Sequence, residues 1–303
     1  CKVNQYETEA MAELFADSGY EIKEFTEVAD VYVINTCSVT NMGDRKSRQI
    51  IRRAKKLNPN AVIAVTGCYA QTAPDEVLAI EGVNLVLGTK DRKNIVTLVE
   101  ELNTESNINH VSDIMSNHEF EELQIKQYSN RTRAFIKIQE GCNQFCSYCI
   151  IPYARGPVRS RAKDDVVREI KELAHNGFKE IILVGIHVAS YGVDLGDTTL
   201  ESLIMDVDKI DGVERIRLSS IEPMTLNQEF IDSIKDSKKL CHYFHISLQS
   251  GCDETLKRMN RKYTTAQFKG IVDGLREAFD DVAITTDITV SYTHLRAHET
   301  YQY

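Results

Sequence analysis

The sequence predicts an α/β protein, with an open parallel α/β domain first and a partial (β/α) barrel after it. Apolar β-runs alternate with amphipathic helical stretches along both halves, and this alternation is typical of parallel sheets. In the second half the later β-runs recur roughly every 30 to 40 residues, the length of one βα unit. A chain of 303 residues also suits two domains of ordinary size.

The first half contains three short apolar runs that we expect to be buried strands, at 31–35 (VYVIN), 61–65 (AVIAV) and 83–88 (VNLVLG). Residues 6–18 and 41–57 are expected to be helices, because Gly19 ends the first and Asn58 with Pro59 ends the second.

Residues 101–133 are polar and rich in Asn and Ser, so we expect a linker beginning near 101. We place the N-terminal domain at 1–124 and the second domain at 125–290. Residues 291–303 lack a hydrophobic period and are expected to be foreign sequence, an irregular natural tail being the alternative. Because residue 1 is Cys and not Met, we also expect the parent protein to begin earlier.

The second half repeats the βα pattern, with expected strands at 134–138, 180–186, 215–220, 243–248 and 282–288. Residues 164–177 place Val166, Ile170 and Leu173 on one helical face and stop at Asn176 and Gly177. In a barrel of this kind the chemistry gathers at the carboxyl ends of the strands.

Composition excludes several classes of protein. No apolar run approaches the ~18 residues needed to cross a membrane, and we expect no membrane partner. Eight cysteines in so long a chain are too few for a disulfide scaffold, and no export signal opens it. The net charge of −9 argues against unspecific coating of nucleic acid. We therefore expect a cytoplasmic protein whose cysteines bind metal.

Three cysteines, Cys142, Cys146 and Cys149, follow the first β-run of the second half with the spacing C-x3-C-x2-C. We call them the loop set. Thiolates hold iron–sulfur clusters, and an electron-transfer [4Fe–4S] centre takes four of them. Three ligands leave one iron open to a further molecule, although the same spacing also suits zinc.

Cys37 and Cys68 each come immediately after a buried β-run of the first half. Residues beyond the carboxyl ends of neighbouring parallel strands meet in one crevice. Cys1 would join them if the residues before it formed a strand. We call Cys1, Cys37 and Cys68 the strand-end set; the alternative is that they are isolated core cysteines. Cys241 and Cys252 fit neither set.

The order of several motifs resembles the methylthiotransferases, a family of radical S-adenosylmethionine (SAM) enzymes. These motifs are CKVNQYE at residue 1, KIQEGCNQFCSYCIIPYARGPVRSR at 137, VGIHVASYG at 184, RLSSIEP at 217 and SLQSGCDETLKRMNR at 247. The first two are most similar to the branch that modifies N6-threonylcarbamoyladenosine at tRNA position 37. Methylthiolation of isopentenyladenosine-37 or of a ribosomal protein aspartate is the alternative within the family. A zinc-binding RNA-binding module and a two-cluster electron carrier are alternatives of other classes.

The resemblance implies two [4Fe–4S] clusters and SAM as cofactors. The loop set would hold the cluster that generates a radical from SAM, and the strand-end set an auxiliary cluster that carries the sulfur to be transferred. It implies tRNA, an electron donor such as flavodoxin or ferredoxin, and a sulfur source as partners. Family members continue beyond the Thr285-Thr286-Asp287 strand with segments that this chain lacks, so we expect the chain as given to be poorly active.

The resemblance also places SAM-binding residues, for which the sequence offers these candidates: Tyr148, Ser219, Ser220, Glu222, Gln249 and Ser250. Two structural alternatives stay open. The residues before Pro223 could cap the following helix, and Gln249-Ser250-Gly251 could form a turn.

Basic residues cluster in an otherwise acidic chain, most densely at 45–56, which holds seven basic and no acidic residues. Such clusters predict contacts with RNA phosphates. A guanidinium just beyond the loop set could also pair with the SAM carboxylate. The candidates are Arg45, Lys46, Arg48, Arg52, Arg53, Arg155, Arg159 and Arg161.

Overall fold

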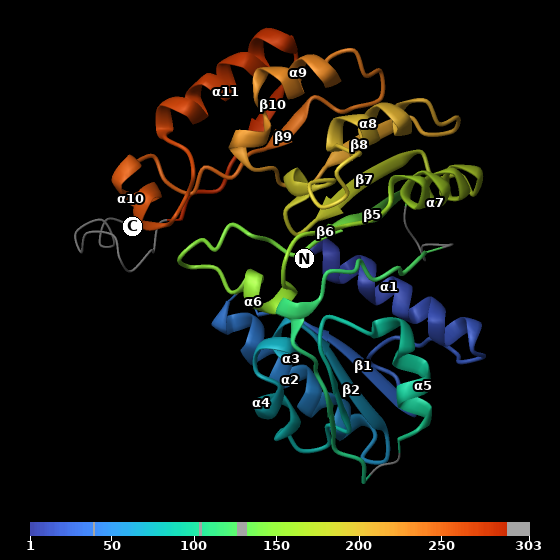
Figure 1. The fold of residues 1–303 in the computed structure, drawn as a ribbon. Helices are drawn as coiled ribbons and strands as arrows, with labels where there is room; N and C mark the ends of the chain where they lie inside the picture. Colours follow the sequence, from blue (N-terminus) through green and yellow to red (C-terminus); the bar gives the residue numbers. More distant parts are fainter. Residues whose placement is uncertain (39, 103–104, 126–131, 290–303) are drawn as a thin grey trace. The chain divides into compact units, whose positions relative to one another are not determined.

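The computed structural model describes residues 1–38, 40–102, 105–125 and 132–289 (Figure 1). The chain forms two compact units. The first comprises Cys1–Tyr128 and Ile150–Pro157, and the second comprises Ser129–Cys149 and Val158–Tyr303. The short segment after the loop set thus packs within the first unit. The expected tail at 291–303 lies outside the described residues.

The first unit is built on a four-stranded parallel sheet in the order β1-β2-β3-β4. Its strands are β1 (Val31–Thr36), β2 (Val62–Gly67), β3 (Leu85–Leu87) and β4 (Ile108–His110). Its helices are α1 (Lys2–Asp17), α2 (Asn41–Leu57), α3 (Cys68–Thr72), α4 (Pro74–Leu78), α5 (Ile95–Glu100) and α6 (Ile151–Arg155). Short 3-10 turns stand at Arg92–Asn94 and Ile114–Ser116.

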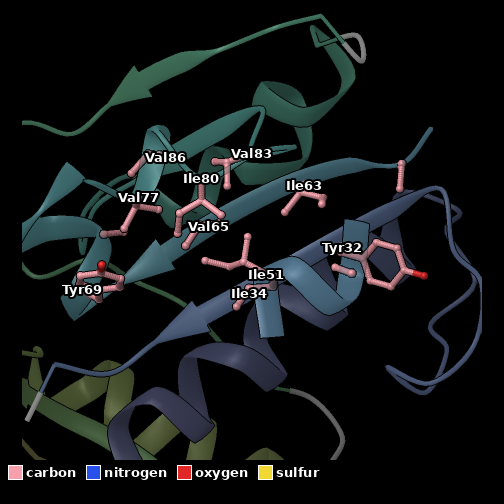
Figure 2. Close-up of a cluster of buried hydrophobic side chains, with 13 residues drawn as sticks. Tyr32, Ile34, Ile51, Ile63, Val65, Tyr69, Val77, Ile80, Val83 and Val86 are labelled. Atoms are coloured by element: carbon pink, nitrogen blue, oxygen red, sulfur yellow. The ribbon is translucent and has the colours of Figure 1, made fainter. Parts of the chain in front are cut away.

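Alternation along the strands divides this unit's core between the two faces of the sheet. On one face Ile34 and Ile63 pack with Ile51 of α2, and Figure 2 shows this cluster. On the other face Ala64 and Leu85 pack with residues of α1 and α5. Strands β2 and β3 are therefore buried on both sides, which explains why their sequences are continuous apolar runs.

Strand β4 was not expected, since it falls in the polar stretch predicted to be a linker. It pairs with β3 through Leu85 and Ile108. Further along, Leu123 and Ile125 are buried, and the Tyr6 hydroxyl donates a hydrogen bond to the Leu123 carbonyl. A three-residue strand with exposed side chains carries no hydrophobic period, so the sequence pattern could not predict it.

The second unit contains a parallel sheet that curls into part of a barrel, as the sequence predicts. Strands β5 (Arg133–Glu140), β7 (Glu180–Gly185) and β8 (Arg215–Leu218) pair in parallel, and the short β6 (Arg159–Ser160) pairs antiparallel to β5. Strands β9 (Tyr243–His245) and β10 (Ala283–Thr285) form a parallel pair. A parallel bridge from Ile221 to Ile246 links β9 to the end of β8.

Helices follow the strands of this unit in order, as Figure 1 shows for α7 (Lys163–His175), α8 (Leu200–Asp208), α9 (Gln228–Ile234) and α11 (Thr265–Ala278). Val166, Ile170 and Leu173 of α7 are fully buried. Capping boxes begin α8 at Thr199 and α11 at Thr264. A short helix, α10 (Asp253–Arg258), and 3-10 turns at Val188–Ser190 and Pro223–Thr225 complete the unit. Among the described residues no helix is long and apolar enough to cross a membrane.

Candidate functional site

Two members of the strand-end set lie at the ends of paired strands in the first unit. Thr36 of β1 is the register partner of Gly67 of β2, so Cys37 and Cys68 follow two adjacent paired residues. Gly67 has a φ of 95°, and a Cβ there would lie 2.5 Å from the Thr36 carbonyl oxygen. Glycine is therefore required for the chain to turn from β2 directly into α3, where Cys68 is the first residue.

Cys1 is connected to this strand end through Asn4. Its sulfur caps α1 by accepting a hydrogen bond of 3.5 Å from the Asn4 backbone N–H. The Asn4 side chain donates from Nδ2 to the Thr36 carbonyl oxygen at 2.7 Å, one residue before Cys37. The structure thus links all three positions to one end of the sheet.

Arg155 of α6 also lies at this end of the sheet. Its Nε–H donates to the Cys68 sulfur at 3.3 Å. Its Nη2 donates to the Asn4 Oδ1 at 2.6 Å and to the Glu7 Oε2 at 2.9 Å. Arg155, Glu7 and Cys68 are all buried. The Arg155 guanidinium is held by buried partners of its own unit, and contact with RNA phosphate stays a prediction for Arg155.

The loop set of the second unit lies on residues 141–149, the loop that follows β5. Gly141 and Phe145 have positive φ values of 76° and 47°, so the loop folds back on itself. The Ser147 backbone N–H donates to the Met259 carbonyl at 3.1 Å. Asn260 donates from Nδ2 to the Phe145 carbonyl at 2.9 Å. The segment around 258–260 therefore fixes the loop.

Arg261 is a site residue that the sequence reasoning did not identify. Its Nη1 donates to the Cys146 sulfur at 3.4 Å, and its Nη2 lies 3.3 Å from the Glu222 carboxylate. The same guanidinium donates from Nε to the Tyr263 hydroxyl at 3.2 Å. Its basic neighbours made it look like part of a phosphate-binding surface, and the distinguishing signal was its place at the end of SLQSGCDETLKRMNR.

At this site burial and the Arg261 charge shift the pKa values of Cys142 and Glu222 in opposite directions. Burial raises the pKa of Cys142 to about 11, while the Arg261 charge acts in the opposite direction. Burial likewise raises the pKa of Glu222, and Arg261 again lowers it. In the absence of bound groups the loop thiol is thus held protonated, and metal binding must displace its proton.

The predicted SAM residues divide into two groups by burial. Ser219 and Glu222 are buried beyond the carboxyl end of β8, whereas Ser220 is exposed. Within the described part of the chain the Ser219 Oγ is buried without a hydrogen-bond partner. Glu222 does not cap the following turn with its side chain, and its carboxylate instead faces Arg261. The capping alternative therefore does not explain Glu222.

Gln249 makes an isolated parallel bridge to Ile288, and the turn at Gln249-Ser250-Gly251 stays a prediction. Gln249 has a φ of 66°, and the Ser250 Oγ accepts a hydrogen bond from the Cys252 backbone N–H at 3.2 Å. The Gln249 side chain also accepts from the Thr289 hydroxyl at 2.8 Å. Tyr148, next to Cys149, keeps 40% of its surface exposed. Binding of SAM by these three residues stays a prediction.

Comparisons with known proteins match each unit to a family. The uncharacterized protein family UPF0004 matches residues 1–88, and the Radical SAM superfamily matches residues 136–299. The threonylcarbamoyladenosine tRNA methylthiotransferase MtaB of Bacillus subtilis is 47% identical over 308 residues, covering 100% of this chain and 68% of that protein. Its namesake from Aquifex aeolicus is 40% identical, covering 96% of this chain and 71% of that protein.

The chain belongs to the methylthiotransferase family of radical SAM enzymes. Another similar protein is the tRNA-2-methylthio-N(6)-dimethylallyladenosine synthase of Thermoanaerobacter pseudethanolicus, 38% identical over 96% of this chain and 63% of its own length. Among solved structures, the radical SAM methyltransferase TsrM of Kitasatospora setae with a SAM analogue matches with a TM-score of 0.66 and 16% identity. That match covers 93% of this chain and 64% of TsrM, and it supports the fold alone.

The donor sets suit the cofactors of a radical SAM methylthiotransferase. Thiols are the ligands that iron–sulfur clusters use, and the partnerless Ser219 Oγ beside buried Glu222 offers polar atoms to a bound molecule. Within the described residues, no three Cys, His, Asp or Glu side chains are gathered closely enough to hold a single metal ion. The assignment of two clusters to the two thiol sets remains a prediction.

Arg159 and Arg161 were expected to contact RNA, and the structure places both in buried ion pairs. Arg161 is buried in an ion pair with Glu169 of α7. Arg159 is buried with its Nη2 3.8 Å from the Glu140 carboxylate, which Lys137 also contacts at 3.2 Å. Each cation is neutralised inside its own unit, where its desolvation is offset by a carboxylate. Contact of these two arginines with RNA phosphate stays a prediction.

The basic face of α2 is exposed over part of its length. Arg45, Lys46 and Arg52 are exposed to solvent. Arg48 instead donates to the Tyr69 hydroxyl at 2.9 Å, and Arg53 stacks on the Phe25 ring at 5.7 Å. Arg53 is nevertheless exposed, and RNA binding by α2 stays a prediction.

Proposed function

We propose that this chain is the catalytic part of a tRNA methylthiotransferase that adds a methylthio group to C2 of N6-threonylcarbamoyladenosine at position 37. The observation that carries the proposal is the 47% identity to the Bacillus subtilis enzyme of that name across the whole chain. The loop set beyond β5, and Cys37 and Cys68 beyond β1 and β2, support it because sulfur insertion needs a sulfur carrier besides the radical source.

The clusters and SAM, when bound, supply one-electron chemistry able to reach an unactivated C–H bond. The loop set would hold one cluster, and Ser219 and Glu222 would orient SAM beside it. Arg261 keeps the Glu222 carboxylate beside the Cys146 sulfur, which places a charged acceptor where an ammonium group of a ligand can pair with it. Hydrogen at adenine C2 is not acidic, so no general base is required of the protein.

The partners follow from this chemistry. The substrate would be the anticodon loop of a tRNA, with α2 supplying phosphate contacts through Arg45, Lys46 and Arg52. A flavodoxin or ferredoxin would reduce the cluster, and a separate sulfur source would replenish the auxiliary one. Free thiols and a tRNA substrate suit a cytoplasmic location.

A second substrate is favoured by a specific observation. A relative 38% identical to this chain is named as a synthase acting on dimethylallyladenosine in tRNA. The two modified bases share the adenine ring and differ at N6, so only the pocket around N6 distinguishes them.

The test uses the 303-residue chain, reconstituted anaerobically with iron and sulfide and reduced with dithionite. It is mixed with SAM and with tRNA carrying threonylcarbamoyladenosine, dimethylallyladenosine or plain adenosine at position 37. Mass spectrometry of the digested tRNA measures methylthio product, and methionine release measures SAM cleavage. Product on the first tRNA alone supports the proposal, and product on the second alone supports the alternative. Zinc uptake without methionine release would contradict both.

A further inference from the structure

We propose that Arg155 is a positioning residue for the strand-end set: its guanidinium holds the Cys68 sulfur in place and raises the reduction potential of the cluster bound there. This rests on the proposed function, since it requires an iron–sulfur cluster on Cys1, Cys37 and Cys68. It assigns Arg155 a role that its place in a basic stretch of sequence did not suggest.

The first step of the argument is geometric. One guanidinium plane contacts the Cys68 sulfur through Nε, at 3.3 Å, and the Asn4 Oδ1 through Nη2, at 2.6 Å. Asn4 in turn contacts the Cys1 sulfur and the Thr36 carbonyl that precedes Cys37. Arg155 and Asn4 together therefore contact the Cys68 and Cys1 sulfurs and the residue that precedes Cys37.

The second step concerns how Arg155 itself is held. Glu7 accepts from both Nη atoms of Arg155, which is the bidentate arrangement that fixes an arginine most firmly. The Thr89 hydroxyl donates to the Ala154 carbonyl at 2.7 Å, which anchors α6 in the same unit. The Nε–H is consequently aimed at the sulfur by groups that do not belong to the thiol set.

The third step concerns charge. Reduction adds negative charge to a cluster, and a buried cation close to one of its sulfurs stabilises that charge in a medium of low dielectric constant. Hydrogen bonds to the ligand sulfurs are among the factors that set the potential of iron–sulfur clusters. Removal of the Arg155 charge should therefore make the cluster harder to reduce.

The chain offers a matched control in Arg92. It is equally buried and pairs with the same Glu7 carboxylate, and its other partner is Glu121, at 2.9 Å from Nε. It is not the guanidinium that donates to the Cys68 sulfur. Arg92→Gln therefore disturbs the same ion network and leaves the Cys68 contact in place.

The experiment is a potentiometric titration followed by electron paramagnetic resonance, with iron content measured on the same samples. Cys142→Ala, Cys146→Ala and Cys149→Ala are present throughout, so that only a cluster on the strand-end set is observed. The variants are Arg155→Gln, Arg155→Lys and Arg92→Gln. Glu7→Gln/Arg155→Gln is added because removing both charges leaves no unpaired buried ion if Arg155→Gln alone unfolds.

We expect a lower midpoint potential in Arg155→Gln and in the double variant, a smaller decrease in Arg155→Lys, and no change in Arg92→Gln. Equal potentials in all variants would overturn this inference while leaving the proposed function intact. An equal decrease in Arg92→Gln would also overturn it, since the effect would then belong to the ion network. Failure of the parent variant to bind iron would overturn the inference and the proposed auxiliary cluster together.

Discussion

Thr36 and Gly67 are the last paired residues of β1 and β2, and Cys37 and Cys68 follow them directly. Two cysteines separated by about a βα unit in sequence are thereby placed at one end of a sheet. The loop set lies in the other unit, so substitutions can test metal binding by each thiol set separately.

We expect about eight iron atoms per chain after anaerobic reconstitution, with a visible band of thiolate-to-iron charge transfer. Replacing the loop set by alanine should remove half of the iron, and replacing the strand-end set should remove the other half. Iron analysis and the visible spectrum measure this. Cys241→Ala/Cys252→Ala is the control and should keep the full iron content. Stoichiometric zinc in a colourless wild type would contradict the prediction.

Ser219→Ala should separate SAM binding from folding. The Ser219 Oγ is buried without a partner in the described structure, so its removal should leave the free energy of unfolding unchanged or raise it by about 1 kcal/mol. If the hydroxyl binds SAM, the dissociation constant of SAM should rise several-fold, as measured by calorimetry. Ser220→Ala, at an exposed position, is the matched control. A marked loss of stability in Ser219→Ala would show that the hydroxyl has a structural role instead.

Charge reversal on α2 tests the RNA surface. Arg45→Glu/Lys46→Glu/Arg52→Glu should weaken tRNA binding and reduce the slope of log affinity against log salt by about 2 to 3. The control is Lys171→Glu/Lys269→Glu/Arg276→Glu, which changes the net charge equally on exposed positions of α7 and α11. Filter binding at several salt concentrations measures both. Equal effects of the two triple variants would mean that α2 is not the binding surface.

The buried pair of Arg161 and Glu169 should be essential to the stability of the second unit. Both side chains are almost completely buried. Arg161→Gln should lower the free energy of unfolding by about 3–5 kcal/mol, because it leaves an unpaired buried carboxylate. Urea unfolding measures this. Lys179→Gln, at an exposed ion pair with Glu214, should change the free energy of unfolding little. A small effect of Arg161→Gln would mean that water reaches Glu169.

His187 should make stability depend on pH. Burial, and then the Arg261 charge, lowers the pKa of His187 from 6.5 to about 4. Because the folded state binds this proton less tightly than the unfolded state, the contribution of neutral His187 is present above pH 6.5 and is lost as the pH falls toward 4. The free energy of unfolding should fall by about 3 kcal/mol once the pH is below both pKa values, 6.5 and about 4. This pH-dependent part of the free energy of unfolding should vanish in His187→Gln and persist in His110→Gln. Urea unfolding at each pH measures it.

Much of the fold could be predicted because parallel strands buried on both faces leave continuous apolar runs. The runs at 31–35 and 180–186 correspond to β1 and β7 within a residue or two. Strand β4 could not be predicted, since its side chains are exposed and its pairing with β3 depends on residues over twenty positions away. The packing of α6 in the first unit is likewise decided by Thr89 and Glu7, which no local pattern connects to Arg155.

The sequence by itself determined the α/β class, because strand periodicity is a local property of the chain. Its motifs, in their order, resemble one family, and its cysteine spacing predicts the two thiol sets. Only the tertiary structure decided what the arginines do. A run of basic residues has the same sequence pattern whether its side chains face solvent or a buried carboxylate. Arg155, Arg159 and Arg161 each contact a glutamate, and for Arg155 this is Glu7, nearly 150 residues earlier in the chain. Such long-range pairs exist only when the elements that carry them have packed.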